Sequence, residues 1–374
     1  MEVLSSVSSV LNAFAALTDP RVARTRRYPL GDLLLITLCG LLCGADNYVA
    51  ICRWAKARAH WLRAHLQITQ VPSHDTLGRV LAKLDSRELA AALGAWSGQL
   101  WEQAKREGDV VAFDGKRVKG ALDNLNLISA WASRSQLSLA LADAGQGADE
   151  QAALRHLLQV VNVSGCLVTA DALHTQTATA KAIVEHGADY LLALKANQGS
   201  TYESVAAYFE RVRSGQAQAA SACRHVMKER GVREERRCWT LLDTGFVDPW
   251  DRWARLGTLV CVERRCFRGP QLVSDQVRYF VSSATGSASR FLRATRRHWG
   301  IENSLHWRLD VFFGEDACRV RQGEAATNLA TLRRLALSLL KREKTEKVGV
   351  QTKRQMAGWD SDYLEKLLTA GTAE

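Results

Sequence analysis

The order of strand-like and helix-like segments after Asp109 places the strongest limit on what this chain can fold into. Three strand-like runs come first, and the first two are separated by a polar turn that contains glycine. Helical and strand patterns then alternate. The strand-like runs are VVAF (110–113), LISAWAS (127–133), LSLALA (137–142), LVTA (167–170) and YLLAL (190–194). This order predicts the α/β class, with a mixed sheet and flanking helices.

The first 108 residues predict an all-helical N-terminal domain. Ser73 precedes one amphipathic helix, and Ser86 is in position to cap the next. A third helix is expected between Asn47 and Leu66. Its basic residues lie beside two tryptophans, which indicates a DNA-binding head, although a helical bundle with a basic surface explains the same pattern. These residues are Arg53, Lys56, Arg58, Arg63, Trp54 and Trp61.

The predicted catalytic core is interrupted by residues 199–276, a charged segment with strand-like pieces that we interpret as a β-rich insertion. The run VRYFVSS (277–283) returns to the sheet, and two long helices follow. We expect the second, from about Glu324, to expose its basic side chains, Arg333, Arg334, Lys341 and Arg342. The predicted division is therefore 1–108, 109–198, 199–276, 277–345 and 346–374, with one short helix at 361–368.

Charge and cysteine content limit the class of partner and the compartment. The formal net charge is +11, and residues 290–354 supply +8 of it, which favours a polyanionic partner such as nucleic acid. Solvated surface charge is the alternative. Nine cysteines without a Cys-x-x-Cys pair, and no secretory signal, predict reduced thiols in the cytoplasm. The longest apolar run is too short to span a membrane.

Three carboxylates occupy positions suited to a metal site. Asp114 ends the first strand-like run, Asp171 ends a later one, and Glu302 lies in a helix. Two Mg²⁺ ions held by few carboxylates can activate an attacking oxygen and stabilise a leaving one in phosphoryl transfer. Each acid also has a structural interpretation. Asp114–Gly115 can form a hairpin turn, Asp171 can cap a helix, and Glu302 can be an exposed helical residue.

A stripe of polar residues surrounds Glu302. His298, Glu302 and His306 are spaced i, i+4, i+8, which predicts that they lie close to one face of a helix. Zinc binding is one interpretation, but the spacing is not His-Glu-x-x-His. Phosphate contact or positioning of the Glu302 carboxylate is the preferred interpretation, and a packed, hydrogen-bonded pair is the alternative. Asp310, two helical turns on, is the substitute metal ligand.

Long phrases of the sequence resemble one family of bacterial transposases. AFDGKRVKGA, VTADALHTQ, DYLLALKANQ and HWGIENSLHWRLDVFFGEDACRVR are similar to the H-repeat-associated (ISAs-type) insertion-sequence transposases of the DDE superfamily. YPLGDLLLITLCGLLCGADNY and VPSHDTLGRVL resemble the helical domain that precedes the catalytic domain in that family. The resemblance runs from about residue 17 to 340. It implies a ribonuclease H-like fold in which Asp114, Asp171 and Glu302 form the DDE triad.

The resemblance also implies the reaction and its partners. We expect a DNA transposase that cuts and rejoins strands with two Mg²⁺ ions, for which Mn²⁺ can substitute. The partners would be terminal inverted repeats and target DNA, bound by a homo-oligomer, at least a dimer, on DNA in the bacterial cytoplasm and nucleoid. The alternatives are a nuclease without strand transfer and an inactive or domesticated DNA-binding relative. Predicted DNA contacts are Lys116, Lys119, Lys195, Asn197, Gln198, Arg297, His298 and His306, with ordinary loop polarity as the other interpretation.

Some positions depart from the family pattern. The broader superfamily often has arginine four residues before the glutamate and lysine seven residues after it. Here those positions hold His298 and Leu309. The three acids are unaffected by these departures.

Overall fold

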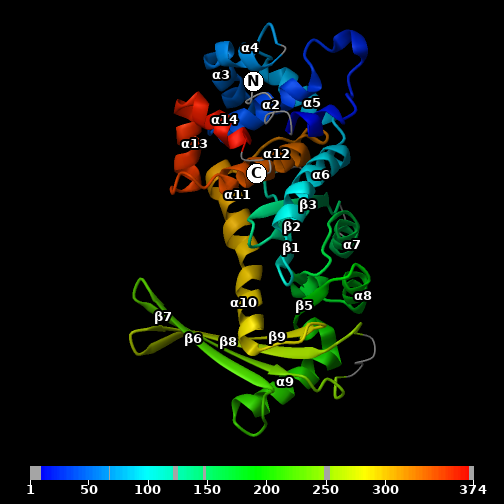
Figure 1. Cartoon of the computed structure of the whole chain (residues 1–374), viewed down its shortest axis with the longest axis vertical. Coiled ribbons are helices and arrows are strands. Elements are labelled where there is room, and N and C mark those ends of the chain that lie inside the picture. Colours follow the sequence, from blue (N-terminus) through cyan, green and yellow to red (C-terminus); the bar gives the residue numbers. More distant parts are fainter. Residues whose placement is uncertain (1–9, 67, 121–124, 146–148, 248–252, 370–374) are drawn as a thin grey trace. The chain divides into compact units, whose positions relative to one another are not determined.

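The computed structural model describes residues 10–66, 68–120, 125–145, 149–247 and 253–369 (Figure 1). The chain forms two compact units. The first comprises the described parts of Met1–Lys105, Gly115–Val161 and Ile301–Glu374, and the second those of Arg106–Asp114 and Asn162–Gly300. These units group the chain differently from the predicted division, because the helices near the two ends of the chain share one unit.

Nine strands of the described residues form a mixed sheet in the order β3-β2-β1-β4-β5-β9-β8-β7-β6. Strands β1, β4 and β5 are parallel, and the other pairs whose register is known are antiparallel. The predicted mixed α/β sheet with flanking helices is therefore confirmed. The strands are β1 (Val110–Arg117), β2 (Asn126–Ala132), β3 (Leu137–Asp143), β4 (Leu167–Ala170), β5 (Asp189–Leu194), β6 (Ser221–Glu229), β7 (Val232–Leu241), β8 (Thr258–Arg268) and β9 (Gln271–Ser282).

The second unit packs helices on both faces of its strands. Helix α10 (Ala288–His298) lies against β4, β6, β7 and β8, where Phe291 and Leu292 join a core with Val260 and Phe280 (Figure 1). Helix α9 (Gly199–Arg213) contacts β9, with the Phe209 ring stacked on Tyr279 at a centroid distance of 6.0 Å. The third helix is α8 (Thr177–Glu185), which contacts β5.

The β-rich insertion is present, and it is more regular than the sequence indicates. Strand β6 was not predicted, and β7, β8 and β9 extend beyond their apolar runs. The reason is that β6 and the far end of β9 are largely exposed, and the far ends of β7 and β8 are mostly half-buried, so that polar residues occupy both faces. A strand whose two faces both meet water has no apolar alternation to reveal it.

The first unit contains a helical bundle. Its N-terminal helices confirm the all-helical prediction, but the helix expected between Asn47 and Leu66 is two helices that meet at Arg58. Ser73 caps its helix as expected, whereas Asp85 and not Ser86 caps the following one. The Ser86 hydroxyl instead donates to Glu324. The helices are α2 (Leu30–Leu42), α3 (Tyr48–Ala57), α4 (Ala59–His65), α5 (His74–Lys83), α6 (Ser86–Ala104) and α7 (Glu150–Val160), after the short turn η1 (Ala23–Thr25).

Helix α12 (Ala325–Arg342) contradicts the prediction of a basic outer face. It is buried on all sides, because it packs against α2, α5, α6, β3, α11 (Trp307–Phe313), α13 (Val350–Trp359) and α14 (Ser361–Thr369). Arg333 and Arg334 are each only 2% exposed. Arg333 donates to the Asp46 carbonyl and Arg334 to Glu315, which gives these charged groups partners inside the unit.

The C-terminal residues cover part of the N-terminal bundle. Helix α13 (Val350–Trp359) was not predicted, whereas α14 (Ser361–Thr369) matches the expected 361–368 segment closely. Arg58 donates to the Gly358 carbonyl and the Ser361 hydroxyl, and Trp61 donates to Glu365. Two of the side chains assigned to a DNA-binding head therefore hold the C-terminal helices.

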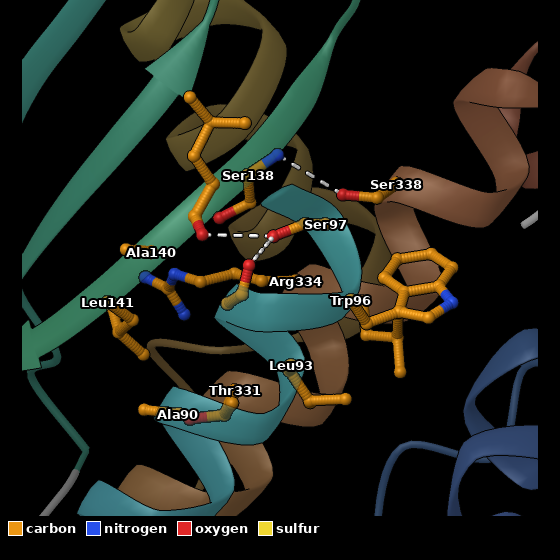
Figure 2. Close-up of a pocket in the computed structure, with 13 residues that line it drawn as sticks. Ala90, Leu93, Trp96, Ser97, Ser138, Ala140, Leu141, Thr331, Arg334 and Ser338 are labelled. Carbon is orange, nitrogen blue, oxygen red and sulfur yellow. Dashed lines mark hydrogen bonds between the residues drawn. The ribbon is translucent and has the colours of Figure 1, made fainter. Parts of the chain in front are cut away.

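A small cavity lies between α6, β3 and α12 in the first unit (Figure 2). Its volume is about 30 Å³, enough for about two water molecules. The Ser97 hydroxyl donates to the Leu139 carbonyl, and the Ser138 N–H donates to the Ser338 hydroxyl, beside Arg334 (Figure 2). These bonds join α6, β3 and α12 around the cavity.

Acid is expected to loosen the C-terminal helices through Glu343. Burial alone would raise the pKa of this carboxyl, but bonds from Lys353, Thr345, Glu346 and Tyr363 lower it to about 2 from an ordinary 4.5. The ionised form therefore stabilises the folded protein above pH 4.5, and this stability is lost as the pH falls from 4.5 towards 2. We expect the urea midpoint of the wild type to fall as the pH is lowered across this range. The urea midpoint of Glu343→Gln should be lower at the start and should fall less steeply. Glu185→Gln, an exposed control, should follow the wild-type slope.

Candidate active site

The register of two parallel strands brings Asp114 and Asp171 together. Strands β1 and β4 pair from Val110↔Leu167 to Phe113↔Ala170, so the next residue on each strand is an aspartate. Neighbouring strands are separated by about 4.8 Å, and side chains at paired positions point to the same face. The buried VVAF and LVTA runs fix this register because both are enclosed in the core. The register therefore places Asp114 and Asp171 directly after the last paired residues of the two neighbouring strands.

Asp114 does not end its strand, contrary to the sequence prediction. Strand β1 continues to Arg117, because β2 lies beside it in the sheet after the pairing with β4 has stopped. Asp114 and Gly115 are thus inside a strand, which excludes the hairpin-turn interpretation. The turn expected between β1 and β2 includes residues 121–124, which lie outside the described residues.

Asp171 is held in its ionised form by its neighbours. Burial alone would raise its pKa, but the Ala172 backbone N–H, the Lys195 ammonium and His298 together bring it below the ordinary value. The Lys195 Nζ atom lies 3.2 Å from Asp171 Oδ2. The turn η3 (Ala172–His174) has three residues and the Asp171 side chain does not cap it, which removes the helix-cap interpretation.

His298 lies over the same face of β4 as Asp171. Its Nδ1 atom is 3.0 Å from the Thr169 hydroxyl, and Thr169 is two residues before Asp171 on the strand. Arg297, the preceding residue of α10, is exposed. Both positions are compatible with the predicted DNA contact, which stays a prediction.

The loop after β5 carries three of the predicted DNA-contact residues, of which two are exposed and one is hydrogen-bonded within the protein. Lys195 and Asn197 are exposed. The Gln198 side chain accepts a hydrogen bond from the Lys195 N–H at 2.7 Å and donates to the Ala172 and Thr175 carbonyls, both at 3.2 Å. Gln198 therefore ties this loop, η4 (Ala196–Gln198), to the turn after Asp171, and its amide is already occupied.

The segment around Glu302 is not the single regular helix that the i, i+4, i+8 spacing predicts. Helix α10 ends at His298, and η6 (Glu302–His306) is a π-helical turn that leads into α11 (Trp307–Phe313). Such wide turns occur frequently at functional sites. Glu302 Oε2 lies 3.7 Å from His306 Nδ1, so the two side chains still meet.

His306 is buried, with 5% of its surface exposed, and this contradicts its prediction as a DNA contact. Burial lowers its pKa, and the nearby Glu302 carboxylate only partly offsets that effect. A neutral imidazole can accept a hydrogen bond or bind a metal ion, whereas a buried side chain cannot reach a phosphate on the surface.

Glu302 and His306 belong to the first unit, and Asp114 ends a segment of the second. Asp114 is half-buried, Glu302 is exposed and His306 is buried. Carboxylate oxygens and an imidazole nitrogen are ligands that divalent cations accept, and the exposed Glu302 carboxylate leaves room for solvent or substrate ligands.

Lys116 is buried, so the prediction that it contacts DNA is wrong. It is 7% exposed, and its ammonium contacts Asp310 and lies 3.6 Å from Glu315 and 3.4 Å from Asp316. Asp310 is thereby engaged in an ion pair, which weakens its case as the substitute metal ligand. Burial raises the Asp310 pKa, and Lys116 offsets that increase only in part. Lys119 differs from Lys116, since its side chain is 79% exposed and 3.6 Å from Asp316.

Two further charged residues lie close to this part of the sheet. Arg278 on β9 is exposed, with its guanidinium 4.5 Å from the centre of the Trp299 ring. Glu150, in the first turn of α7, accepts a hydrogen bond from Asn126 and lies close to Gly115. The sequence does contain a signal for Arg278, since it is an arginine within the otherwise apolar run VRYFVSS.

Comparison with known proteins defines the class of this chain. The family described as "Transposase DDE domain" matches residues 103–339, and the DDE_Tnp_1-associated family matches residues 11–97. The mixed sheet and the paired aspartates lie within the first match. The chain belongs to the DDE transposase family.

Its relatives point to a particular branch of that family. The chain is 30% identical to "Putative transposase YncI" of Escherichia coli O157:H7, with 98% of this chain and 95% of the relative covered. It is 28% identical to "H repeat-associated putative transposase YhhI" of Escherichia coli (strain K12), with 97% and 98% covered. An uncharacterized protein in the dhlA 3' region of Xanthobacter autotrophicus is 34% identical over 73% of this chain. The predicted resemblance to the H-repeat-associated transposases is therefore confirmed.

Among the described residues, no helix is both long enough and apolar enough to cross a membrane.

Proposed function

We propose that this protein transposes an insertion sequence by cleaving DNA strands and joining their ends to target DNA, with Asp114, Asp171 and Glu302 binding two divalent metal ions. The observation that carries the proposal is the β1–β4 register, in which Asp114 and Asp171 directly follow the paired residues Phe113 and Ala170, in a member of the DDE family. Glu302 is included because it lies within the residues that the DDE family matches, in the phrase HWGIENSLHWRLDVFFGEDACRVR that resembles the family.

The proposed metal is Mg²⁺, with Mn²⁺ as a substitute. Carboxylate oxygens are the ligands that Mg²⁺ prefers, and it keeps several positions for water and phosphate oxygens. When bound, a pair of such ions activates the attacking oxygen and stabilises the leaving oxygen of an in-line displacement. His306 contributes in this proposal as the buried group that orients the Glu302 carboxylate.

The remaining side chains would act on charge and position. Lys195 and the Ala172 N–H keep Asp171 ionised, which is the form that binds a cation. Lys119, Lys195, Asn197, Arg297 and His298 remain candidates for contacts to DNA phosphates. Because the residues themselves only bind and orient, no covalent link between protein and DNA is part of the proposal.

The proposed partners are the inverted repeats at the two ends of the element and the target DNA. Joining two ends at one target requires two active sites, so we propose at least a homodimer on DNA. The proposed location is the bacterial cytoplasm, on nucleoid DNA.

A supercoiled plasmid carrying the DNA that flanks the gene on both sides tests this function. With Mg²⁺ or Mn²⁺ we expect cleavage at the element boundaries, 3′-hydroxyl ends and products joined to target DNA, and with EDTA we expect none. Cleavage without joined products would assign a nuclease and contradict transposition. Absence of cleavage with either metal, from protein that binds the same DNA, would reject metal-dependent strand cleavage altogether.

A further inference from the structure

One face of the sheet in the second unit carries a row of charged side chains that begins at the paired aspartates. Residues at paired positions share a face, so the register can be followed from strand to strand. Leu194 pairs with Tyr279, which sets the following residue, Lys195, beside Arg278. Gln276 pairs with Arg264, and Arg264 pairs with Arg236. The row on this face, here called the basic row, is Asp114, Asp171, Lys195, Arg278, Arg264 and Arg236.

The two faces of these strands differ in how their arginines are paired. On the face opposite the basic row, four arginines meet four acids in ion pairs, and Lys228 and Arg233 lie on that face as well. The paired residues are Arg213, Arg224, Arg237, Arg265, Glu210, Glu235, Glu263 and Asp275. These four arginines are already engaged with carboxylates of the protein.

The basic row retains an excess of positive charge. Arg236 and Arg264 share one carboxylate, Glu234, at 2.7 and 2.6 Å. Arg278 is exposed and stacks on Trp299, which holds the guanidinium in place while leaving its N–H donors available. Arg296 of α10 adds another cation on the same face, where its guanidinium reaches Met227 of β6.

We infer that the basic row binds the phosphate backbone of the duplex DNA that enters the active site, with Arg278 and Arg264 as its principal contacts. This inference deepens the proposed function and rests on it. The row is continuous with Asp171 through Lys195, so a strand held along it reaches the site of cleavage. Arginine suits this role because its planar fork of donors matches phosphate oxygens.

The length of the row also fits DNA. Four strand spacings separate β4 from β7, which is about 19 Å. A duplex rises about 3.4 Å for each phosphate of one strand, so the row spans about five or six base pairs. Contacts of this kind are independent of base sequence, which makes them suitable for the DNA on either side of a cut.

Two double variants with the same net charge test the inference. Arg264→Gln/Arg278→Gln removes two cations from the basic row. Arg265→Gln/Arg224→Gln removes two from the opposite face, and Arg265 is the strand neighbour of Arg264. Binding of each full-length protein to a labelled duplex of about 30 base pairs of arbitrary sequence is measured in EDTA over a range of salt concentrations. Thermal melting checks that each protein is folded.

We expect the basic-row variant to lower the slope of log affinity against log salt by about 2, because each lost phosphate contact removes about 0.9. Its affinity at about 0.1 M salt should fall at least about tenfold. The opposite-face variant should change the slope by less than about 0.5. Equal losses in the two variants, or no loss in the basic-row variant, would overturn the inference. Since no metal is present, these results are separate from strand cleavage, and failure of the wild type to bind DNA would instead reject the proposed function.

Discussion

Asp114→Asn and Asp171→Asn proteins are expected to lose DNA strand cleavage by on the order of 1000-fold while they still bind DNA. Metal ions contribute several kcal/mol to the stabilisation of developing charge in such reactions, and each 1.36 kcal/mol corresponds to a factor of ten in rate. Asparagine has the shape of aspartate, and both positions are incompletely buried, so the fold should tolerate the change. The rate of cleavage of the flanking-DNA plasmid is the measurement.

The sign of the effect on DNA binding separates this loss from damage to the protein. Removing a negative charge beside the phosphates should leave binding in EDTA unchanged or slightly tighter. Asp275→Asn is the matched control, because Asp275 lies in the same unit and pairs with Arg265 on the opposite face. We expect it to cleave at the wild-type rate. Wild-type cleavage by Asp114→Asn or Asp171→Asn would remove that residue from metal binding.

The pairing of the two aspartates was predictable, because each follows a short apolar run and parallel strands end at a common edge. The local sequence also predicted Glu302 and His306 as neighbours, since residues four apart meet on a helix. It did not predict the π-helical turn or the burial of His306. Those depend on packing with segments far away in the chain.

For the basic residues, local sequence patterns did not predict which side chains are buried. Lys116 and Arg334 read as surface cations, and the apolar spacing of α12 predicted the helix correctly. Both are buried beside carboxylate partners, Asp310 and Glu315. These partners come from a different segment of the chain, so the local sequence does not reveal them. A buried arginine and an exposed one look the same in sequence unless the partner is known. Charge at a single position therefore did not distinguish a buried cation such as Lys116 from an exposed one such as Lys119.

The same buried cluster gives the second large effect, on stability. Glu315 is fully buried, with Oε1 2.7 Å from Arg334 and Oε2 3.6 Å from Lys116. Burial alone would raise its pKa, but Arg334, Lys116 and Arg333 hold it below the ordinary value. Glu315→Gln keeps the shape and leaves two buried cations short of an anion. We expect the free energy of unfolding to fall by about 3–5 kcal/mol, measured by urea denaturation.

An exposed pair supplies the comparison. Lys181 and Glu185 lie 3.8 Å apart on α8, with most of each side chain in water, so Glu185→Gln should cost less than about 0.5 kcal/mol. The double variant Glu315→Gln/Arg334→Met should lose less stability than the two single variants together, by more than about 1 kcal/mol, because removing Arg334 also removes the uncompensated charge. A cost for Glu315→Gln as small as that of Glu185→Gln would contradict the burial of this ion pair. Additive losses would show instead that Glu315 and Arg334 contribute independently, with Lys116 as the true partner of the carboxylate.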